Sequence, residues 1–233
     1  MKLSLIIPCF NEAKSLPKLV KRCKELTEIY ENSEVILVDN GSLDDTEDTL
    51  KCLLLNCEHV SYISLTGNKG YGGGIIEGLK AAQGEILCWT HADLQTDVLD
   101  ILHGVKFFKQ AKFPERVFVK GRRFGRPFPD TLFTWGMSIF ETILFKQYFW
   151  DINAQPTMFH AEFFKSWEDP PIDFSLDLYT YYQALCQGLT IKRFPVEFSK
   201  RQYGVSNWNI DLKSKLRFIK RTVVYSLGLR KRL

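Results

Sequence analysis

The chain has 233 residues, of which 45% are hydrophobic and 25% are charged, and its formal net charge is +4. This length and composition predict a globular protein with one substantial core. No stretch reaches the roughly 18 uninterrupted apolar residues that span a bilayer, and the first residues lack the apolar region of a signal peptide. We expect one domain over residues 1–210 and an appended tail over residues 211–233.

Six cysteines are scattered along the chain without a CxxC pair or a Cys/His cluster of zinc spacing. They predict buried free thiols in a reducing compartment rather than a disulfide framework. We therefore expect a cytoplasmic protein.

The positive charge belongs to the tail. After Asp211 the chain has no acid but eight basic residues, so subtracting these eight from +4 leaves −4 for the rest. This distribution argues against a nucleic-acid-binding surface and predicts one local acidic partner. Apolar residues interleave with the basic ones, which predicts a basic amphipathic helix that holds the protein peripherally at the cytosolic face of an anionic membrane. The alternatives are a solvated helix and an oligomer contact, and oligomeric state stays open.

Short apolar runs rich in branched residues alternate with helical patterns. The helical patterns cover residues 16–29, the segment after Asp44, the segment after the glycines at 72–74, and residues 177–186. The strands are expected at 3–7, 34–38, 60–65, 85–89, 116–120 and 191–198. This alternation predicts an α/β fold with a mostly parallel sheet and helices on both faces.

Polar residues directly follow three of these strands. Because ligands bind beyond the carboxyl ends of the strands in an open parallel sheet, we expect the three clusters to share one edge. Such residues also cap helices and form turns, but their coincidence at three strand ends favours a site. The clusters are Pro8, Cys9, Phe10, Asn11 and Glu12; Asp39, Asn40, Gly41, Ser42 and Asp44; and His91, Ala92, Asp93, Leu94 and Gln95.

A glycine-rich segment follows the third predicted strand, over residues 68–74. It is not a dinucleotide fingerprint, because Ile75 stands where glycine or alanine is needed. It is not a phosphate loop either, because Gly70 follows Lys69 where serine or threonine is needed. The glycines still predict close backbone approach to a ligand, and the helix after them offers free amides at its start.

Taken in order, residues 7–12, residues 38–44, Asn68 with the glycines, and residues 92–95 resemble family 2 glycosyltransferases of the dolichyl-phosphate mannose synthase type. Residues 121–124 are similar to that family's Gly-Ser-Arg-Tyr segment, and residues 201–208 to its late arginine, glycine and serine signature. The resemblance covers residues 3–208 and implies a GT-A fold. It also implies an inverting transfer of a sugar from a GDP- or UDP-sugar.

The resemblance also implies roles for individual residues. Asp93 is expected to take part in catalysis and, with Gln95, to hold Mg²⁺ or Mn²⁺, which prefer oxygen ligands. Arg123 and Arg201 are expected to face phosphates. The donor would contact Pro8, Phe10, Glu12, Asp39, Asn40, Asn68, Ala92 and Asp93.

Three positions depart from the family pattern. His91 replaces a first aspartate, so it either ligates the metal or hydrogen-bonds nearby, and we favour the second role. Asn40 replaces a frequent second aspartate, which leaves Asp39 alone to accept a hydrogen bond from the nucleobase of the donor. The segment over residues 151–156 stands where the relatives place an aspartate, a serine and a glycine before an aromatic residue. Its Asp151 acts either as an acceptor-side catalytic base or as a cap that orients a loop.

The sequence indicates the acceptor less directly than it indicates the donor. A polyprenyl phosphate is already a nucleophile and needs no general base, whereas a sugar hydroxyl of a glycan does, and Asp151 would supply it. We favour the polyprenyl phosphate, although the chain has no basic residue between Arg126 and Lys146. A non-catalytic nucleotide-sugar-binding protein is the rival from another class.

The aromatic segment over residues 133–150 has two interpretations that the sequence leaves open. It is either a helix packed onto the sheet or one that lies at a membrane interface.

Overall fold

The computed structural model describes residues 1–203 and 212–231, with the side chains of 212–218 excepted. Its sheet has the strand order β3-β2-β1-β4-β6-β5-β7. The pairs β1–β2, β2–β3, β1–β4 and β5–β7 are parallel, and β6 is antiparallel to both of its neighbours, β4 and β5. The strands are β1 (Leu3–Cys9), β2 (Ser33–Asp39), β3 (Val60–Ser64), β4 (Ile86–Trp89), β5 (Val117–Phe124), β6 (Thr157–His160) and β7 (Thr190–Glu197).

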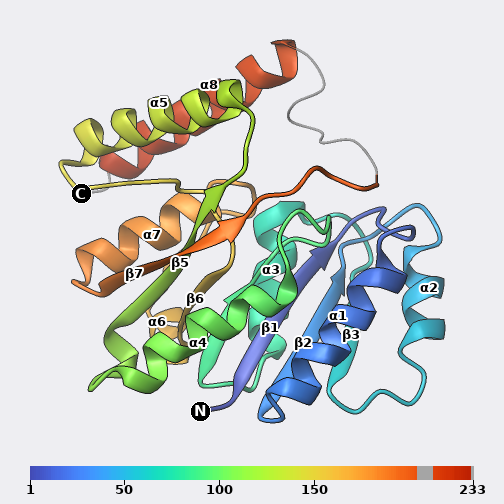
Figure 1. Cartoon of the computed structure of the whole chain (residues 1–233). Helices are drawn as coiled ribbons and strands as arrows, with labels where there is room; N and C mark the ends of the chain where they lie inside the picture. The colour runs from blue at the N-terminus through green and yellow to red at the C-terminus, as the bar shows by residue number, and fades with distance from the viewer. Residues whose placement is uncertain (204–211, 232–233) are drawn as a thin grey trace. The chain divides into compact units, whose positions relative to one another are not determined.

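Helices cover both faces of the sheet, which confirms the predicted fold class (Figure 1). One face is covered by α1 (Leu16–Ile29), α2 (Thr46–Leu53) and α4 (Ile101–Gln110), whose buried apolar side chains share a core with Leu5, Ile7 and Leu37. The opposite face packs on α3 (Gly70–Ala81). A Cβ at Gly78 would overlap Ile6 and lie 2.9 Å from Val38 Cγ2, and these two residues alternate with the first-face residues along β1 and β2.

The second face continues as an aromatic cluster under α6 (Ala161–Lys165) and α7 (Leu176–Cys186). Phe118 of β5 stacks on Tyr181 of α7 with ring centroids 6.0 Å apart, and Phe159 of β6 meets Phe163 of α6 at 5.3 Å. Edge-to-face and offset ring contacts of this kind stabilise a core beyond the area they bury. This cluster therefore packs β5 and β6 against α6 and α7.

The sequence prediction missed β6, which is a four-residue strand that follows a cis peptide bond between Gln155 and Pro156. The third helix begins at Gly70 rather than after the glycines at 72–74. The helix has a glycine at position 72 because the loop before α7 passes too close to it there for a side chain to fit. A Cβ at Gly72 would overlap Pro171 O, and the Gly73 amide donates to Ile172 O at 2.9 Å.

The chain divides into two compact units. The first comprises Met1–Gly125 and Ala154–Tyr203 and contains the whole sheet. The second comprises Arg126–Asn153 and Gly204–Leu233 and contains α5 (Phe128–Phe145) and α8 (Leu212–Lys231). The predicted helical tail is present as α8, while the predicted boundary at residues 210 and 211 lies outside the described residues.

All six cysteines are free, as predicted, but only Cys9, Cys23 and Cys88 are buried, and Cys52 and Cys186 are exposed. In the described ranges 1–203 and 212–231, no helix is both long enough and apolar enough to cross a membrane.

Candidate active site at the carboxyl edge of the sheet

The three polar clusters lie on the edge where β1, β2 and β4 end. Cys9 at the end of β1 pairs with Asp39 at the end of β2, and Ile6 pairs with Trp89 at the end of β4. Because the three strands are parallel and adjacent, the loops that follow them meet at one edge. The expectation that the clusters share an edge is confirmed.

Hydrogen bonds join the first two loops to each other. Asn11, with a φ of 57°, receives a bond from the Leu43 amide on its side-chain oxygen at 2.8 Å, and its own amide donates to Ser42 Oγ at 3.0 Å. The Glu12 amide donates to Thr46 Oγ1 at 2.9 Å. Asparagine tolerates the left-handed conformation better than most residues. The loop that presents Glu12 is therefore held in place by the loop after β2.

Asn40 fastens the second loop to the third. It is 3% exposed, its side-chain oxygen accepts from the Lys69 amide at 3.0 Å, and its side-chain nitrogen donates to Gly70 O at 2.9 Å. Asn68 closes the same turn by accepting from the Gly70 amide at 2.7 Å. In the structure these two predicted donor-binding residues shape the edge of the site through bonds within the protein.

The remaining predicted donor-binding residues differ in burial. Asp39 is 2% exposed and its carboxylate accepts from the Ser42 amide at 3.0 Å. Ala92 is 4% exposed and packs in the core, whereas Pro8, in β1, and Phe10, directly after it, are half-buried. Phe10 follows the last residue of β1 and Asp39 is the last residue of β2, so the two lie at adjacent strand ends.

Glu12 and Arg201 form an ion pair across this edge. Arg201 Nη2 lies 2.6 Å from Glu12 Oε1, and Ser15 Oγ donates to Glu12 Oε2 at 2.9 Å. Burial raises the pKa of Glu12, the Ser15 hydrogen bond and Arg201 oppose that rise, and the charge of Asp93 adds to it. The side chains of Glu12, Arg201 and Asp93 thus lie close enough to interact electrostatically. Arg201 Nε is buried and has no hydrogen-bond partner in the described part of the chain.

Asp93 and Gln95 lie in a tight loop after β4, in which Leu94 has a φ of 58°. Asp93 Oδ1 accepts from the Gln95 amide at 3.1 Å. The Gln95 side-chain nitrogen donates to Ser199 O at 3.1 Å, and the Ser199 amide donates to Gln95 O at 2.8 Å. The loop that carries the predicted metal ligands is therefore joined to the segment that leads to Arg201.

His91 stacks against Tyr71 rather than pairing with an acid. The ring centroids are 5.4 Å apart with the planes at 27°, and Tyr71 stacks on its other side against Phe174 at 4.5 Å. Within residues 1–203 and 212–231 there is no group of three or more histidines, cysteines and acids that could hold a metal ion. Any metal at Asp93 would therefore need further ligand atoms from other residue types, from water or from a bound molecule.

Arg123 lies near the end of β5, where it pairs with Val196 of β7. Its guanidinium carbon lies 5.3 Å from the centre of the Phe198 ring, in a cation–π contact. Arg123 is half-buried, so the phenyl ring supports its guanidinium at the chain segment that continues to Arg201.

Asp151, the second predicted catalytic residue, belongs to the second unit. It is 4% exposed, its φ is 42°, and its amide donates to Ser138 Oγ at 3.1 Å. This bond fixes the turn after α5, which fits the predicted role of orienting a loop. A role as a base stays a prediction.

A buried polar network that sequence reasoning missed lies next to this edge. Lys120 and Asp177 are both buried, with Lys120 Nζ 2.7 Å from Thr157 Oγ1 and 3.5 Å from Asp177 Oδ1. The Gln155 side-chain nitrogen donates to Asp177 Oδ1 at 2.9 Å and to Tyr71 Oη at 3.1 Å, and Tyr71 Oη donates to Asp177 Oδ2 at 3.2 Å.

This network is coupled to the edge through Tyr71. Burial and the charge of Asp177 raise the pKa of Tyr71 well above its usual value, and Asp93 adds to that effect. In the sequence, Lys120 ends the predicted strand over residues 116–120 and Asp177 begins the predicted helix over residues 177–186, so neither residue stands out. A lysine at the end of an otherwise apolar strand was the one signal that could have found the network, because a buried lysine needs a partner.

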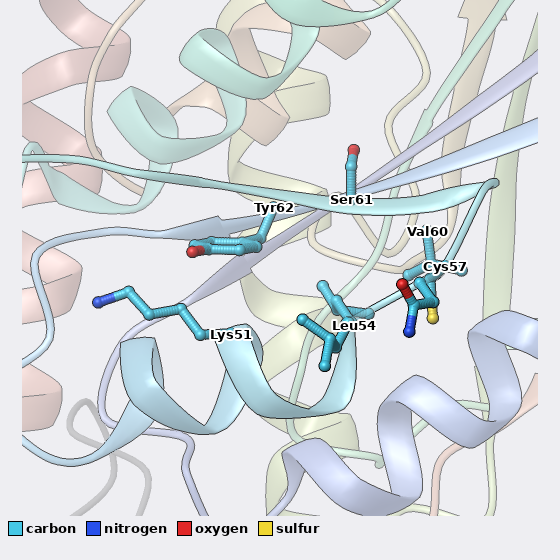
Figure 2. A pocket seen from close by; sticks show the side chains of 8 residues that line it. Lys51, Leu54, Cys57, Val60, Ser61 and Tyr62 are labelled. Atoms are coloured by element: carbon cyan, nitrogen blue, oxygen red, sulfur yellow. The ribbon is translucent and has the colours of Figure 1, made fainter.

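A pocket of about 470 Å³ lies elsewhere, between α2 and β3 (Figure 2). It is lined by Lys51, Leu54, Leu55, Asn56, Cys57, Val60, Ser61 and Tyr62. Its strand residues pair with Val35, Ile36 and Leu37 of β2, whereas the candidate site begins after Asp39. The pocket and the candidate site are therefore distinct.

Solved structures of one enzyme share the fold of this chain. Glucosyl-3-phosphoglycerate synthase from Mycobacterium tuberculosis, crystallised with phosphoglyceric acid, superposes with a TM-score of 0.76 and 16% sequence identity over 98% of this chain and 79% of that one. Its complex with Mn²⁺ and uridine-diphosphate-glucose gives a TM-score of 0.77, again with 16% identity over 98% of this chain, and covers 78% of that one. These likenesses show a GT-A fold.

The sequence profile described as Glycosyl transferase family 2 matches residues 4–167. The chain belongs to glycosyl transferase family 2, as its motifs indicated.

Two curated relatives illustrate the family. The putative glycosyltransferase CsbB of Bacillus subtilis is 31% identical over 132 residues, which are 56% of this chain and 39% of that protein. An undecaprenyl-phosphate 4-deoxy-4-formamido-L-arabinose transferase of Yersinia pestis is 37% identical over 99 residues, which are 40% of this chain and 29% of that protein. The matched regions thus span less than half the length of these relatives.

Proposed function

We propose that this protein transfers a sugar from a nucleotide-diphosphate donor, a GDP- or UDP-sugar, to a polyprenyl phosphate with inversion at the anomeric carbon. The observation that carries the proposal is the arrangement of Arg201, Glu12 and Asp93. A buried guanidinium N–H without a partner lies on a side chain that is paired with Glu12, and Glu12 interacts electrostatically with Asp93. A diphosphate oxygen would satisfy that N–H, which is costly to leave unpaired.

The donor set at Asp93 fits Mg²⁺ or Mn²⁺. Asp93 offers the carboxylate oxygen Oδ2, because Oδ1 already accepts from the Gln95 amide, and Gln95 offers its side-chain oxygen, because its nitrogen donates to Ser199 O. Two oxygen ligands from the protein suit a hard cation that shares the diphosphate and water. Such an ion would act as a Lewis acid on the leaving diphosphate. His91, stacked on Tyr71, would support the site rather than ligate.

The reaction would be a single displacement. An oxygen of the acceptor phosphate attacks the anomeric carbon of the donor sugar, and the bond between that carbon and the diphosphate oxygen breaks with its electron pair leaving on the nucleoside diphosphate. Arg201 and Arg123 would bind the phosphate charge, and Phe10, Asp39 and Pro8 would hold the nucleoside. Because a phosphate is already a nucleophile at neutral pH, no general base is required.

The acceptor class is supported by the printed activity of the Yersinia pestis relative, which acts on undecaprenyl phosphate. A lipid phosphate also agrees with the basic residues of α8, which would hold the protein at an anionic membrane surface. If the acceptor were a sugar hydroxyl instead, Asp151 would be the base. Near-normal transfer by an Asp151→Asn variant would exclude that alternative.

A thermal-shift series with nucleoside diphosphates and nucleotide sugars tests the donor and metal assignments together. We expect one nucleotide to raise the unfolding temperature in the presence of Mn²⁺ and to do so less with EDTA. Absence of any metal-dependent stabilisation would contradict the proposal. Slow Mn²⁺-dependent donor hydrolysis would exclude a protein that only binds nucleotide sugars.

A further inference from the structure

The helix α5 exposes apolar side chains and buries polar ones, which is the reverse of an ordinary surface helix. Its large exposed side chains are all apolar and recur at intervals of three or four residues, which places them on one face. Its buried side chains include two polar ones, Ser138 and Glu141, together with Phe145. The exposed face consists of Phe128, Leu132, Trp135, Ile139 and Ile143, which are 42–73% exposed.

Contacts within the second unit explain why polar side chains of α5 are buried. Glu141 Oε1 lies 2.7 Å from Ser226 Oγ of α8, and Ser138 Oγ accepts from the Asp151 amide at 3.1 Å. Glu141 and Ser138 each therefore have a hydrogen-bond partner within their own unit. Among the described residues of this unit, the apolar face is the side left uncovered, and monomeric soluble proteins rarely expose a contiguous apolar face of this kind.

The charges around this apolar face indicate what kind of partner it binds. Every exposed charged side chain in the described part of the second unit is positive, and these are Lys146, Lys220, Arg221, Arg230 and Lys231. Of the acids in the described part of this unit, Glu141 and Asp151 are buried and Asp130, in the first turn of α5, is half-buried. An apolar helical face with basic neighbours is complementary to the interface of an anionic bilayer, where acyl chains receive the apolar groups and headgroups receive the cations.

The aromatic residues fit the same environment. Trp135 and Trp150 lie with ring centroids 6.3 Å apart, and Tyr148 is 69% exposed just after the helix. Tryptophan and tyrosine prefer the boundary between headgroups and hydrocarbon. Because no helix in the described ranges is long and apolar enough to cross a bilayer, α5 would lie in the plane of the surface.

We propose that the apolar face of α5 (the α5 face: Phe128, Leu132, Trp135, Ile139 and Ile143) docks in the interface of an anionic lipid bilayer. This goes beyond the charge-based attraction proposed for the tail, since it supplies the apolar part of the binding. It does not depend on the identity of the donor or the acceptor.

Flotation of the full chain with lipid vesicles tests this proposal. The vesicles contain either phosphatidylcholine alone or phosphatidylcholine with phosphatidylglycerol. The test variant is Leu132→Ser/Ile139→Ser, and the control is Ile29→Ser/Leu55→Ser, which removes two similarly exposed apolar side chains from the first unit. We expect the wild type and the control to float with the anionic vesicles, and the test variant to partition at least about tenfold more weakly.

Five results would overturn the proposal. The first three are no flotation of the wild type, equal flotation of the test variant, and flotation with neutral vesicles as strong as with anionic ones. The fourth is a concentration-dependent dimer, seen by sedimentation without vesicles, that the test variant abolishes, because the α5 face would then belong to a second copy. A large fall in the unfolding temperature of the test variant would likewise show that the chain itself covers the face. Nucleotide binding measured without vesicles separates each of these results from a failure of the proposed function.

Discussion

At the scale of single residues, the candidate site depends on side chains that engage one another before any ligand binds. Arg201 is held by Glu12, Gln95 by Ser199, and Asn40 by the backbone of the glycine loop. Bonds of this kind fix in advance the positions of the groups that we propose to bind phosphate and metal, which lowers the cost of ordering them when a ligand binds.

Replacing Arg201 with lysine keeps the positive charge but removes the planar guanidinium. We expect the Mn²⁺-dependent affinity for the nucleoside diphosphate to fall about tenfold, because lysine cannot bond Glu12 and a phosphate oxygen with one rigid group. Isothermal titration calorimetry measures the affinity. Arg116→Lys is the matched control, since Arg116 bonds Gly188 O and lies before β5. Equal affinities for the two variants would contradict the assignment of Arg201.

Glu141 gives a pH prediction. Burial raises its pKa to about 7, and its Oε2 is buried without a partner among the residues described. Ser226 Oγ lies close to both Glu141 Oε1 and Thr222 O. Since a hydroxyl has one hydrogen, a protonated Glu141 that donates to Ser226 satisfies both bonds.

A group whose pKa is raised by folding contributes stability below its unfolded pKa and loses it as the pH rises through the folded pKa. We therefore expect the wild type to lose on the order of 1–3 kcal/mol of unfolding free energy between pH 5 and pH 8 through Glu141. The variant Glu141→Gln should lack that part of the loss. Urea denaturation of both proteins at the two pH values measures it. Identical pH dependence would show that Glu141 is ionised throughout.

At the scale of elements, α3 packs so closely against the loop before α7 that side chains would not fit between them. A Cβ at Gly72 would overlap Pro171 O and would lie 2.8 Å from Asp173 O. We expect Gly72→Ala to destabilise the protein by about 1–3 kcal/mol, through the shift it forces in that loop. In α5, Gly136 has open space around its Cβ position, so Gly136→Ala should be neutral or stabilising. Denaturant unfolding that ranks the two variants the other way would refute this packing.

The buried pair of Lys120 and Asp177 joins β5 to α7. We expect Lys120→Met or Asp177→Asn alone to cost about 3–5 kcal/mol, because each leaves the other charge buried with fewer partners. The double variant should cost less than the two single losses added together. A double-mutant cycle of unfolding free energies checks this, and strictly additive losses would contradict a direct interaction.

How well each element could be predicted depended on the range of the contacts that define it. Short apolar runs located β1 to β5 and β7. The clearest runs belong to β1, β2 and β4, because both faces of these parallel strands are buried. The strand β6 was missed because its four residues have no distinctive pattern and it is defined by pairing with β4 and β5. The clusters around Glu12, Asp39 and Asp93 were found because they follow strands directly. The network of Lys120, Gln155 and Asp177 was not, because its partners are far apart in sequence.

At the scale of the whole molecule, the sequence indicated a single GT-A domain with a basic tail, and family and fold agree with that class. The structure also groups residues 126–153 with α8 in one unit, which local periodicity could not indicate. The sequence left the environment of α5 open, because its apolar residues suit either a protein core or a membrane interface. The buried positions of Ser138 and Glu141 are among the observations from which we propose a membrane interface.

Transfer of a labelled sugar from a GDP- or UDP-sugar to polyprenyl phosphate, followed by extraction into organic solvent, tests the proposed activity itself. We expect transfer that requires Mn²⁺ or Mg²⁺, is lost with EDTA, and falls at least about 100-fold in an Asp93→Asn variant that retains the wild-type unfolding temperature. Full transfer by Asp93→Asn, or transfer that is unaffected by EDTA, would contradict it.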